Sequence, residues 1–133
     1  MGLPYMILDH PAMFGKSDVF AIRTLFWWGN FYSITLHVSG RYKDLFEERL
    51  IKNLLQQDLF IAGGEAEWQH HFDAGNFVLF SEVTQHQLTD IMSKNFLKVA
   101  LKYDLKDWDK MQLLLGDGYR RIANLLRGEG ELF

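Results

Sequence analysis

The chain has 133 residues, a mass of 15.6 kDa and a net charge of -3 at neutral pH, and this length fits one domain because chains usually divide only above roughly 200–300 residues. Hydrophobic residues make up 48% of the sequence, which is enough for a packed core and too much for a disordered chain. The sequence has no cysteine, which excludes disulfides, thiolate metal sites and cysteine nucleophiles.

The beginning of the chain lacks a basic leader followed by an apolar run, and no window of about 18 uncharged apolar residues occurs. We therefore expect a cytoplasmic protein that makes no contact with a membrane. The balance of 14 basic against 17 acidic residues does not favour a dedicated nucleic-acid binder.

Two β-strands joined by a hairpin turn are predicted between Ser17 and Val38, with the turn at Trp28–Asn30. The first strand, Val19–Trp27, is apolar on both faces apart from Arg23 and Thr24, which indicates a central position in a sheet. The second strand alternates with a period of two, so we expect one face in the core and one in water. Its predicted core residues are Tyr32, Ile34, Leu36 and Val38, and its predicted solvated residues are Ser33, Thr35 and His37.

A helix is predicted over Tyr42–Gln57 because the apolar residues there recur with a helical period. The predicted buried stripe consists of Leu45, Phe46, Leu50, Ile51, Leu54 and Leu55. Residues 58–75 have turn-forming glycines and no clear period, with a short strand predicted around Trp68–Phe72. Another strand is predicted over Phe77–Val83.

Helices are predicted through the last third of the chain. Thr84 followed by Gln87 has the pattern of a capping box, and helical spacing after it predicts a helix that continues to about Tyr103. Two shorter helices are predicted after it, Trp108–Leu115 with Asp107 as its cap and Tyr119–Arg127, separated by Gly116–Gly118. Strands early and helices late predict a single α+β domain over residues 1–133, with a mostly antiparallel sheet and helices packed on one side.

The densest group of titratable residues surrounds His70 and His71. Imidazoles and carboxylates together are typical of metal and acid-base sites, but adjacent histidines point in different directions on a helix or on a strand. No Gly-x-Ser-x-Gly motif presents a nucleophile either. We therefore expect no catalytic residue, metal or cofactor, and a small enzyme using His70, His71 and nearby carboxylates is the alternative.

The distribution of charge is more informative than any motif. Residues 44–90 carry nine acidic residues against two basic ones, interleaved with aromatic residues. Such a stretch is suited to docking on a basic protein surface, where complementary charge speeds encounter and aromatic anchors slow departure. The candidate partner-binding residues are Glu47, Glu48, Asp58, Glu65, Glu67, Trp68 and Asp73.

Lys94, Lys98 and Lys102 recur every four residues and would form a basic stripe if the helix that begins after Thr84 reaches that far. A stripe of this kind is usually a solvated helix face. A nucleic-acid or interaction module that uses this stripe is a further alternative.

The residues Met13–Ile22, the sequence Trp27-Trp28-Gly29-Asn30-Phe31 and the strand that ends in Val38-Ser39-Gly40 resemble the opening of small immunity proteins of bacterial polymorphic-toxin and contact-dependent growth-inhibition systems. The resemblance covers roughly residues 13–42 and consists of strand and turn patterns. It implies a small, acidic, cytosolic protein without catalysis that neutralises a cognate toxin, often a nuclease, by covering its active site or substrate groove. It carries over no site residues.

Overall fold

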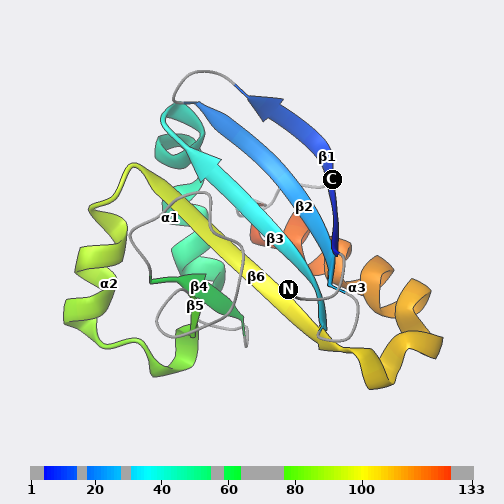
Figure 1. Ribbon diagram of the computed structural model, residues 1–133. Coiled ribbons are helices and arrows are strands. Elements are labelled where there is room, and N and C mark those ends of the chain that lie inside the picture. The colour runs from blue at the N-terminus through cyan, green and yellow to red at the C-terminus, as the bar shows by residue number, and fades with distance from the viewer. Residues whose placement is uncertain (1–4, 15–17, 28–30, 55–58, 64–76, 127–133) are drawn as a thin grey trace.

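The computed structural model describes residues 5–14, 18–27, 31–54, 59–63 and 77–126. The described strands form one six-stranded sheet in the order β1-β2-β3-β6-β4-β5, and each neighbouring pair is antiparallel (Figure 1). The strands are β1 (Tyr5–Phe14), β2 (Val19–Trp27), β3 (Phe31–Ser39), β4 (Phe60–Ala62), β5 (Phe77–Leu79) and β6 (Phe96–Asp104). The helices are α1 (Arg41–Leu54), α2 (Gln85–Met92) and α3 (Met111–Leu125), with the 3-10 helices η1 (Phe80–Glu82) and η2 (Leu105–Lys110).

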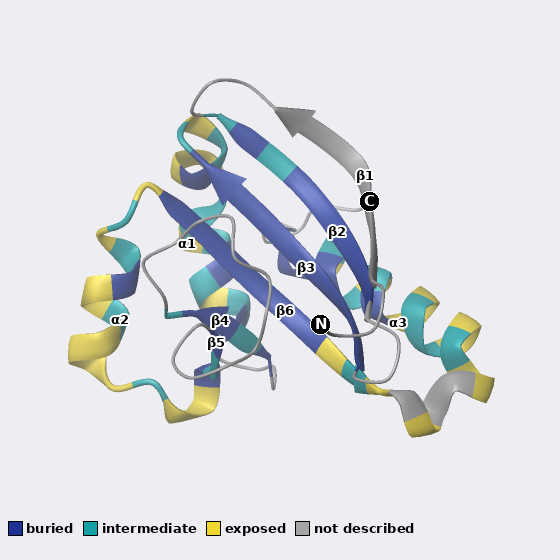
Figure 2. Ribbon diagram, in the orientation of Figure 1, coloured by how far each residue is buried: buried dark blue, intermediate teal, exposed yellow. Residues whose placement is uncertain are grey.

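The two longer helices, α1 and α3, cover one face of the sheet, and α2 lies beside the end formed by β4 and β5 (Figure 1). The hydrophobic core lies between the sheet and these two helices, where the strand residues of β3 and β6 meet Leu50, Leu54, Ile122 and Leu125 (Figure 2). The fold is therefore α+β with helices on one side of an antiparallel sheet, as the sequence predicts.

The predicted pair of strands is confirmed, and β2 lies between β1 and β3 as its two apolar faces indicate. The alternation in β3 is also confirmed, because Ile34, Leu36 and Val38 belong to the core that faces the helices. The prediction that the other face is solvated is wrong. Every residue of β3 is buried, and His37 is 0% exposed. The predicted turn at Trp28–Asn30 lies outside the described residues.

The N-terminal strand β1 is not predicted by the sequence pattern. It pairs with β2 along Tyr5–Phe14, but its register shifts between Asp9 and Ala12. Pro11 lies within this shift. A proline cannot donate to the ladder, and an irregular register breaks the period of two that would otherwise reveal a strand.

The predicted helix after β3 is confirmed as α1, which follows Gly40 with its positive φ of 58°. Within α1, Leu50 and Leu54 are fully buried as predicted, but Leu45 is 61% exposed, so its predicted place in the core is wrong. In the first turn of α1, the buried residue on the same side of the helix as Leu50 and Leu54 is Lys43, which is 7% exposed. Residues 55–58 at the predicted end of the helix lie outside the described residues.

The middle of the chain forms shorter elements than predicted. The predicted strand Phe77–Val83 is a strand only over β5, and η1 follows it. The segment predicted to be irregular from residue 58 contains β4, which pairs with both β5 and β6. The predicted strand at Trp68–Phe72 lies outside the described residues.

The predicted start of α2 is confirmed, because Oγ1 of Thr84 accepts from the N–H of Gln87 and the Gln87 side chain accepts from the N–H of Thr84. The predicted continuation to Tyr103 is wrong. The helix ends at Met92, and Phe96–Asp104 forms strand β6, which pairs with β3 over nine residues. The basic stripe along a helix therefore does not form.

The last predicted pair of helices is a single helix, α3, that continues through Gly116–Gly118. Its C-terminal carbonyl groups accept hydrogen bonds from α1, because Nδ2 of Asn53 lies 2.9 Å from the oxygen of Leu125 and Nη1 of Arg49 lies 3.4 Å from that of Leu126. These bonds fix α3 against α1. None of the helices in the described part of the chain has the length and apolar character that a membrane crossing requires.

Candidate functional site

The sheet face opposite to α1 and α3 carries polar and charged side chains, and we call it the polar face. Its buried polar residues on β2, β3 and β6 are Arg23, Ser33, Thr35, His37, Ser39 and Lys98. Because antiparallel partners lie about 4.5–5.5 Å apart, the register places His37 directly beside Lys98. Both side chains are 0% exposed, so neither can contact a partner in solution.

Aromatic rings surround the lysines of β6 on the polar face. Nζ of Lys98 lies 5.4 Å from the ring centre of Phe77 and 5.9 Å from that of Phe96, and Nζ of Lys102 lies 5.0 Å from that of Phe31. A cation over a ring face is attracted by its electrons, and the attraction strengthens away from water. The rings therefore help to hold the Lys98 side chain inside the protein.

The structure separates the lysines that the sequence groups together. Lys98 and Lys102 share the polar face, but Lys98 is buried while Lys102 is exposed. Lys94 precedes β6, and its Nζ donates to the carbonyl oxygen of Gly63 at 3.2 Å. These three side chains do not make a continuous solvent-facing surface for phosphate groups.

Two of the seven predicted partner-binding residues are described, and both lie on α1. Oε2 of Glu47 lies 2.7 Å from Nζ of Lys43, whereas Glu48 is exposed. Nζ of Lys43 also donates to the carbonyl oxygen of Met92 at 3.0 Å, which places Glu47 near the C-terminal end of α2. The other predicted residues, Asp58, Glu65, Glu67, Trp68 and Asp73, lie outside the described residues.

The histidine pair of the alternative enzyme, His70 and His71, also lies outside the described residues. Within the described ranges, no three histidine or carboxylate side chains come close enough together to hold a metal ion. The candidate site that the described residues offer is a surface, and we locate it by the distribution of its charged side chains.

The elements β4, β5, η1 and α2 form what we call the acidic end of the molecule. The sequence has no lysine or arginine from Asn53 to Ser93, and the carboxylates of Glu82 and Asp90 are exposed at this end. Exposed carboxylates that are not offset by exposed cations produce a negative potential that extends into solvent over about 8 Å at physiological salt.

The lysines that approach the acidic end are directed inward. Lys43 donates to Met92, Lys94 donates to Gly63, and Lys98 lies over the ring of Phe77. No carboxylate among the side chains that the structure describes is buried, whereas Lys43, Lys98 and Arg23 are. Lys43 and Lys98 are thus withdrawn from the surface here and Lys94 is half-buried, while the carboxylates of Glu82 and Asp90 stay exposed. The sequence did not predict the burial of these lysines, because a count of charged residues does not distinguish buried lysines from exposed ones.

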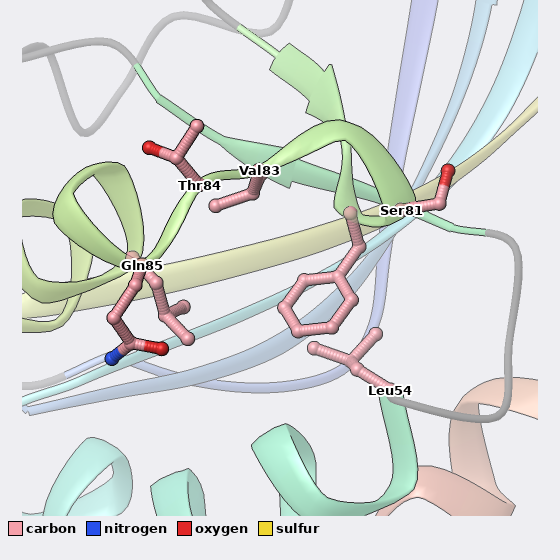
Figure 3. A pocket seen from close by; sticks show the side chains of 7 residues that line it. Leu54, Ser81, Val83, Thr84 and Gln85 are labelled. Atoms are coloured by element: carbon pink, nitrogen blue, oxygen red, sulfur yellow. The ribbon is translucent and has the colours of Figure 1, made fainter.

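Helix α2 lies between two hollows of the surface. One cavity of about 280 Å³ is lined by Leu54, Phe80, Ser81, Val83, Thr84, Gln85 and Leu88 (Figure 3). A second of about 260 Å³ is lined by Gly63, Val78, Gln87, Asp90 and Ile91. The acidic end therefore combines exposed carboxylates with concave, partly apolar surface.

Comparisons with known proteins identify no relative of this chain: no family model, no curated protein and no solved structure matches it.

Proposed function

We propose that this protein is an immunity protein that binds and neutralises a cognate bacterial toxin, and that the acidic end is the surface that meets it. The observation that carries the proposal is the arrangement of charge at η1 and α2, where Glu82 and Asp90 are exposed and the neighbouring lysines are bonded to backbone carbonyls or lie over rings. The resemblance of residues 13–42 to immunity proteins is consistent with it.

Complementary charge explains how such a protein would act. A nuclease toxin needs a basic groove to hold phosphates, so a surface of exposed carboxylates whose neighbouring lysines are directed inward is attracted to that groove. Attraction of this kind raises the association rate and falls with added salt. A protein seated in the groove then excludes the substrate, and no chemical step by the immunity protein is needed.

The biological test is protection from the protein encoded by the adjacent gene. An immunity gene is expected directly downstream of its toxin gene, and that upstream protein is produced in the same cells with and without this chain. We expect growth only when this chain is present. Growth arrest in both cultures would reject the proposal.

A matched pair of charge reversals tests which surface is used. The double variant Glu82→Lys/Asp90→Lys changes the acidic end, and Asp109→Lys/Asp117→Lys changes net charge equally on η2 and α3. Because α2 precedes β6 and η2 follows it, α2 with Asp90 and η2 with Asp109 lie at opposite ends of that nine-residue strand (Figure 1). We expect the first variant to bind the toxin at least about tenfold more weakly than the second, a difference of about 1.4 kcal/mol. Equal losses would show that the acidic end is not the surface used.

A further inference from the structure

The cavity beside the start of α2 has an apolar floor and a polar rim. Leu54 is 0% exposed and Phe80 is 8% exposed, and Val83 and Leu88 are half-buried. Figure 3 shows Leu54 at the end of α1, Val83 on the other side of the hollow, and Gln85 at its α2 side. The exposed rim residues are Ser81, Thr84 and Gln85.

The size of the cavity limits what it can hold. At about 280 Å³ it lies at the lower end of the range of about 300–1,000 Å³ for pockets that enclose whole small molecules. Its apolar floor offers no cation or backbone cradle for a phosphate. A single large apolar side chain fits this chemistry, and anchors of that kind dominate the affinity of protein interfaces.

The negative charge at the cavity rim determines which partner residues are favourable next to the apolar side chain that the cavity would hold. Glu82 is exposed and lies in the chain between the lining residues Ser81 and Val83. No lysine or arginine occurs from Asn53 to Ser93 to offset it. A basic residue next to the anchor would therefore be stabilised at the rim, and an acidic one would be repelled.

Helix N-termini often attract anions, but the capping box reduces the number of N–H groups that this helix start offers. The capping box already uses two of the available N–H groups, because Gln87 N–H donates to Oγ1 of Thr84 at 3.1 Å and Thr84 N–H donates to Oε1 of Gln87 at 2.9 Å. The carboxylate of Glu82 further opposes a negative ligand at this rim.

We propose that this cavity receives one aromatic or large aliphatic side chain of a basic protein partner, with an adjacent lysine or arginine of that partner placed against Glu82. The inference rests on the proposed function, since the partner is the toxin, and it names the anchor by which the toxin is held. The cavity supplies the apolar contact that slows dissociation, and the acidic end supplies the attraction that speeds association.

Short peptides test the recognition chemistry without any toxin. We would titrate the peptide Ac-Lys-Phe-Lys-NH2 into isotope-labelled protein at millimolar concentrations and follow the backbone amides by NMR. We expect shifts concentrated at Val83, Gln85 and Leu88, at least about threefold larger than those caused by Ac-Lys-Ala-Lys-NH2 or by Ac-Glu-Phe-Glu-NH2. Equal shifts with the alanine peptide, larger shifts with the glutamate peptide, or no shifts at all would each overturn the inference.

A pair of tryptophan variants locates the binding in the cavity. Gln85→Trp places a large side chain at the cavity rim, and His86→Trp places the same side chain at the next exposed position of α2, which lines neither cavity. We expect the shifts caused by Ac-Lys-Phe-Lys-NH2 to be lost in Gln85→Trp and kept in His86→Trp. Retention of the shifts in both variants would place the peptide elsewhere and overturn the inference.

The same two variants distinguish this inference from the proposed function. If wild-type protein protects cells from the toxin, and Gln85→Trp binds the toxin as tightly as His86→Trp does, the immunity function stands and the anchor cavity is rejected. If the protein gives no protection while the peptide still binds beside α2, the immunity function is rejected and the cavity remains a site for a basic, apolar-anchored partner.

Discussion

Gly118 on α3 lies so close to Ile34 on β3 that a Cβ atom at position 118 would stand 2.6 Å from Cδ1 of Ile34. The same atom would stand 2.6 Å from Oη of Tyr103, and Gly118 is buried. A glycine at this position allows the helix to approach the sheet. Gly116, two residues earlier, is exposed, and apart from the adjacent backbone of its own helix a Cβ atom at that position would meet no described atom within 4 Å.

Alanine at these two glycines should have opposite effects. Both substitutions raise helix propensity by about 1 kcal/mol, so Gly116→Ala should stabilise the protein by about that amount. Gly118→Ala should be less stable than Gly116→Ala by about 1–3 kcal/mol, because Ile34 is fully buried and has little room to move. Urea unfolding measures both, with an unchanged slope as the control. Equal midpoints would contradict the close approach.

Tyr103 and Tyr119 should also respond differently to removal of their hydroxyl groups. Oη of Tyr119 hydrogen-bonds to Oγ1 of Thr24, whereas the buried Oη of Tyr103 has no hydrogen-bond partner within the part of the chain that the structure describes. We therefore expect Tyr119→Phe to lose about 1 kcal/mol of stability and Tyr103→Phe to keep or exceed wild-type stability at neutral pH. A larger loss in Tyr103→Phe than in Tyr119→Phe would contradict this.

Alkaline pH gives a second measurement for Tyr103. Burial raises the pKa of this phenol above its ordinary value of 10.0. The unfolded chain then loses the proton at lower pH than the folded protein does, so the free energy of unfolding should fall as the pH rises above about 10. Tyr103→Phe should show a smaller fall between about pH 9 and about pH 11 than wild type. Identical pH profiles would show that Tyr103 does not contribute to this fall.

The sequence predicted the fold class, the strands β2 and β3, α1 and the start of α2 because each depends on a local pattern. It failed at β6 because a spacing of four residues is compatible with two structures. Lys98 and Lys102 share a face on a helix, where they are about one turn apart, and also on a strand, where even spacings lie on one side. The segment Phe96–Asp104 forms a strand and not a helix because it pairs with β3 along nine residues, and this long-range interaction is not visible in a local sequence pattern.

The candidate site was less predictable than the fold. Acidic residues in the middle of the chain indicated a docking surface, but the withdrawal of Lys43 and Lys98 from solvent depends on contacts with Met92 and Phe77. Glycine likewise has two meanings in a sequence. Gly116–Gly118 is typical of the end of a helix, yet α3 continues through it, and Gly118 instead allows the helix to pack closely on the sheet.

The capping box of α2 should be required for the shape of the acidic end. Thr84→Ala removes the acceptor for the N–H of Gln87 and should cost about 1 kcal/mol. Thr89→Ala is a matched control, since Thr89 is an exposed threonine of the same helix whose hydroxyl donates to the carbonyl of Gln85 one turn earlier. It should change stability by less than about 0.5 kcal/mol. Hydrogen exchange should show faster opening of α2 in Thr84→Ala alone, and equal rates in both variants would count against the cap.

Lys98 and Lys102 should differ in their contribution to stability, although both lie on the polar face with a ring beside the ammonium group. Lys98→Ala removes a fully buried stem and its contacts with Phe77 and Phe96, so it should cost about 2 kcal/mol or more. Lys102→Ala changes an exposed side chain and should stay within about 0.5 kcal/mol of wild type. Chemical denaturation measures both values.

Lys98→Met separates the two sources of this stability, because methionine keeps an apolar chain of similar length and removes the charge. If packing of the stem dominates, Lys98→Met should recover most of the loss seen in Lys98→Ala. If the charge is required, the two variants should be equally unstable, since the groups that hold the ammonium inside the protein then lose their partner. Equal stability of Lys98→Ala and Lys102→Ala would instead show that Lys98 is accessible to water. Lys98 would then no longer count among the inward-directed lysines on which the negative surface of the acidic end depends.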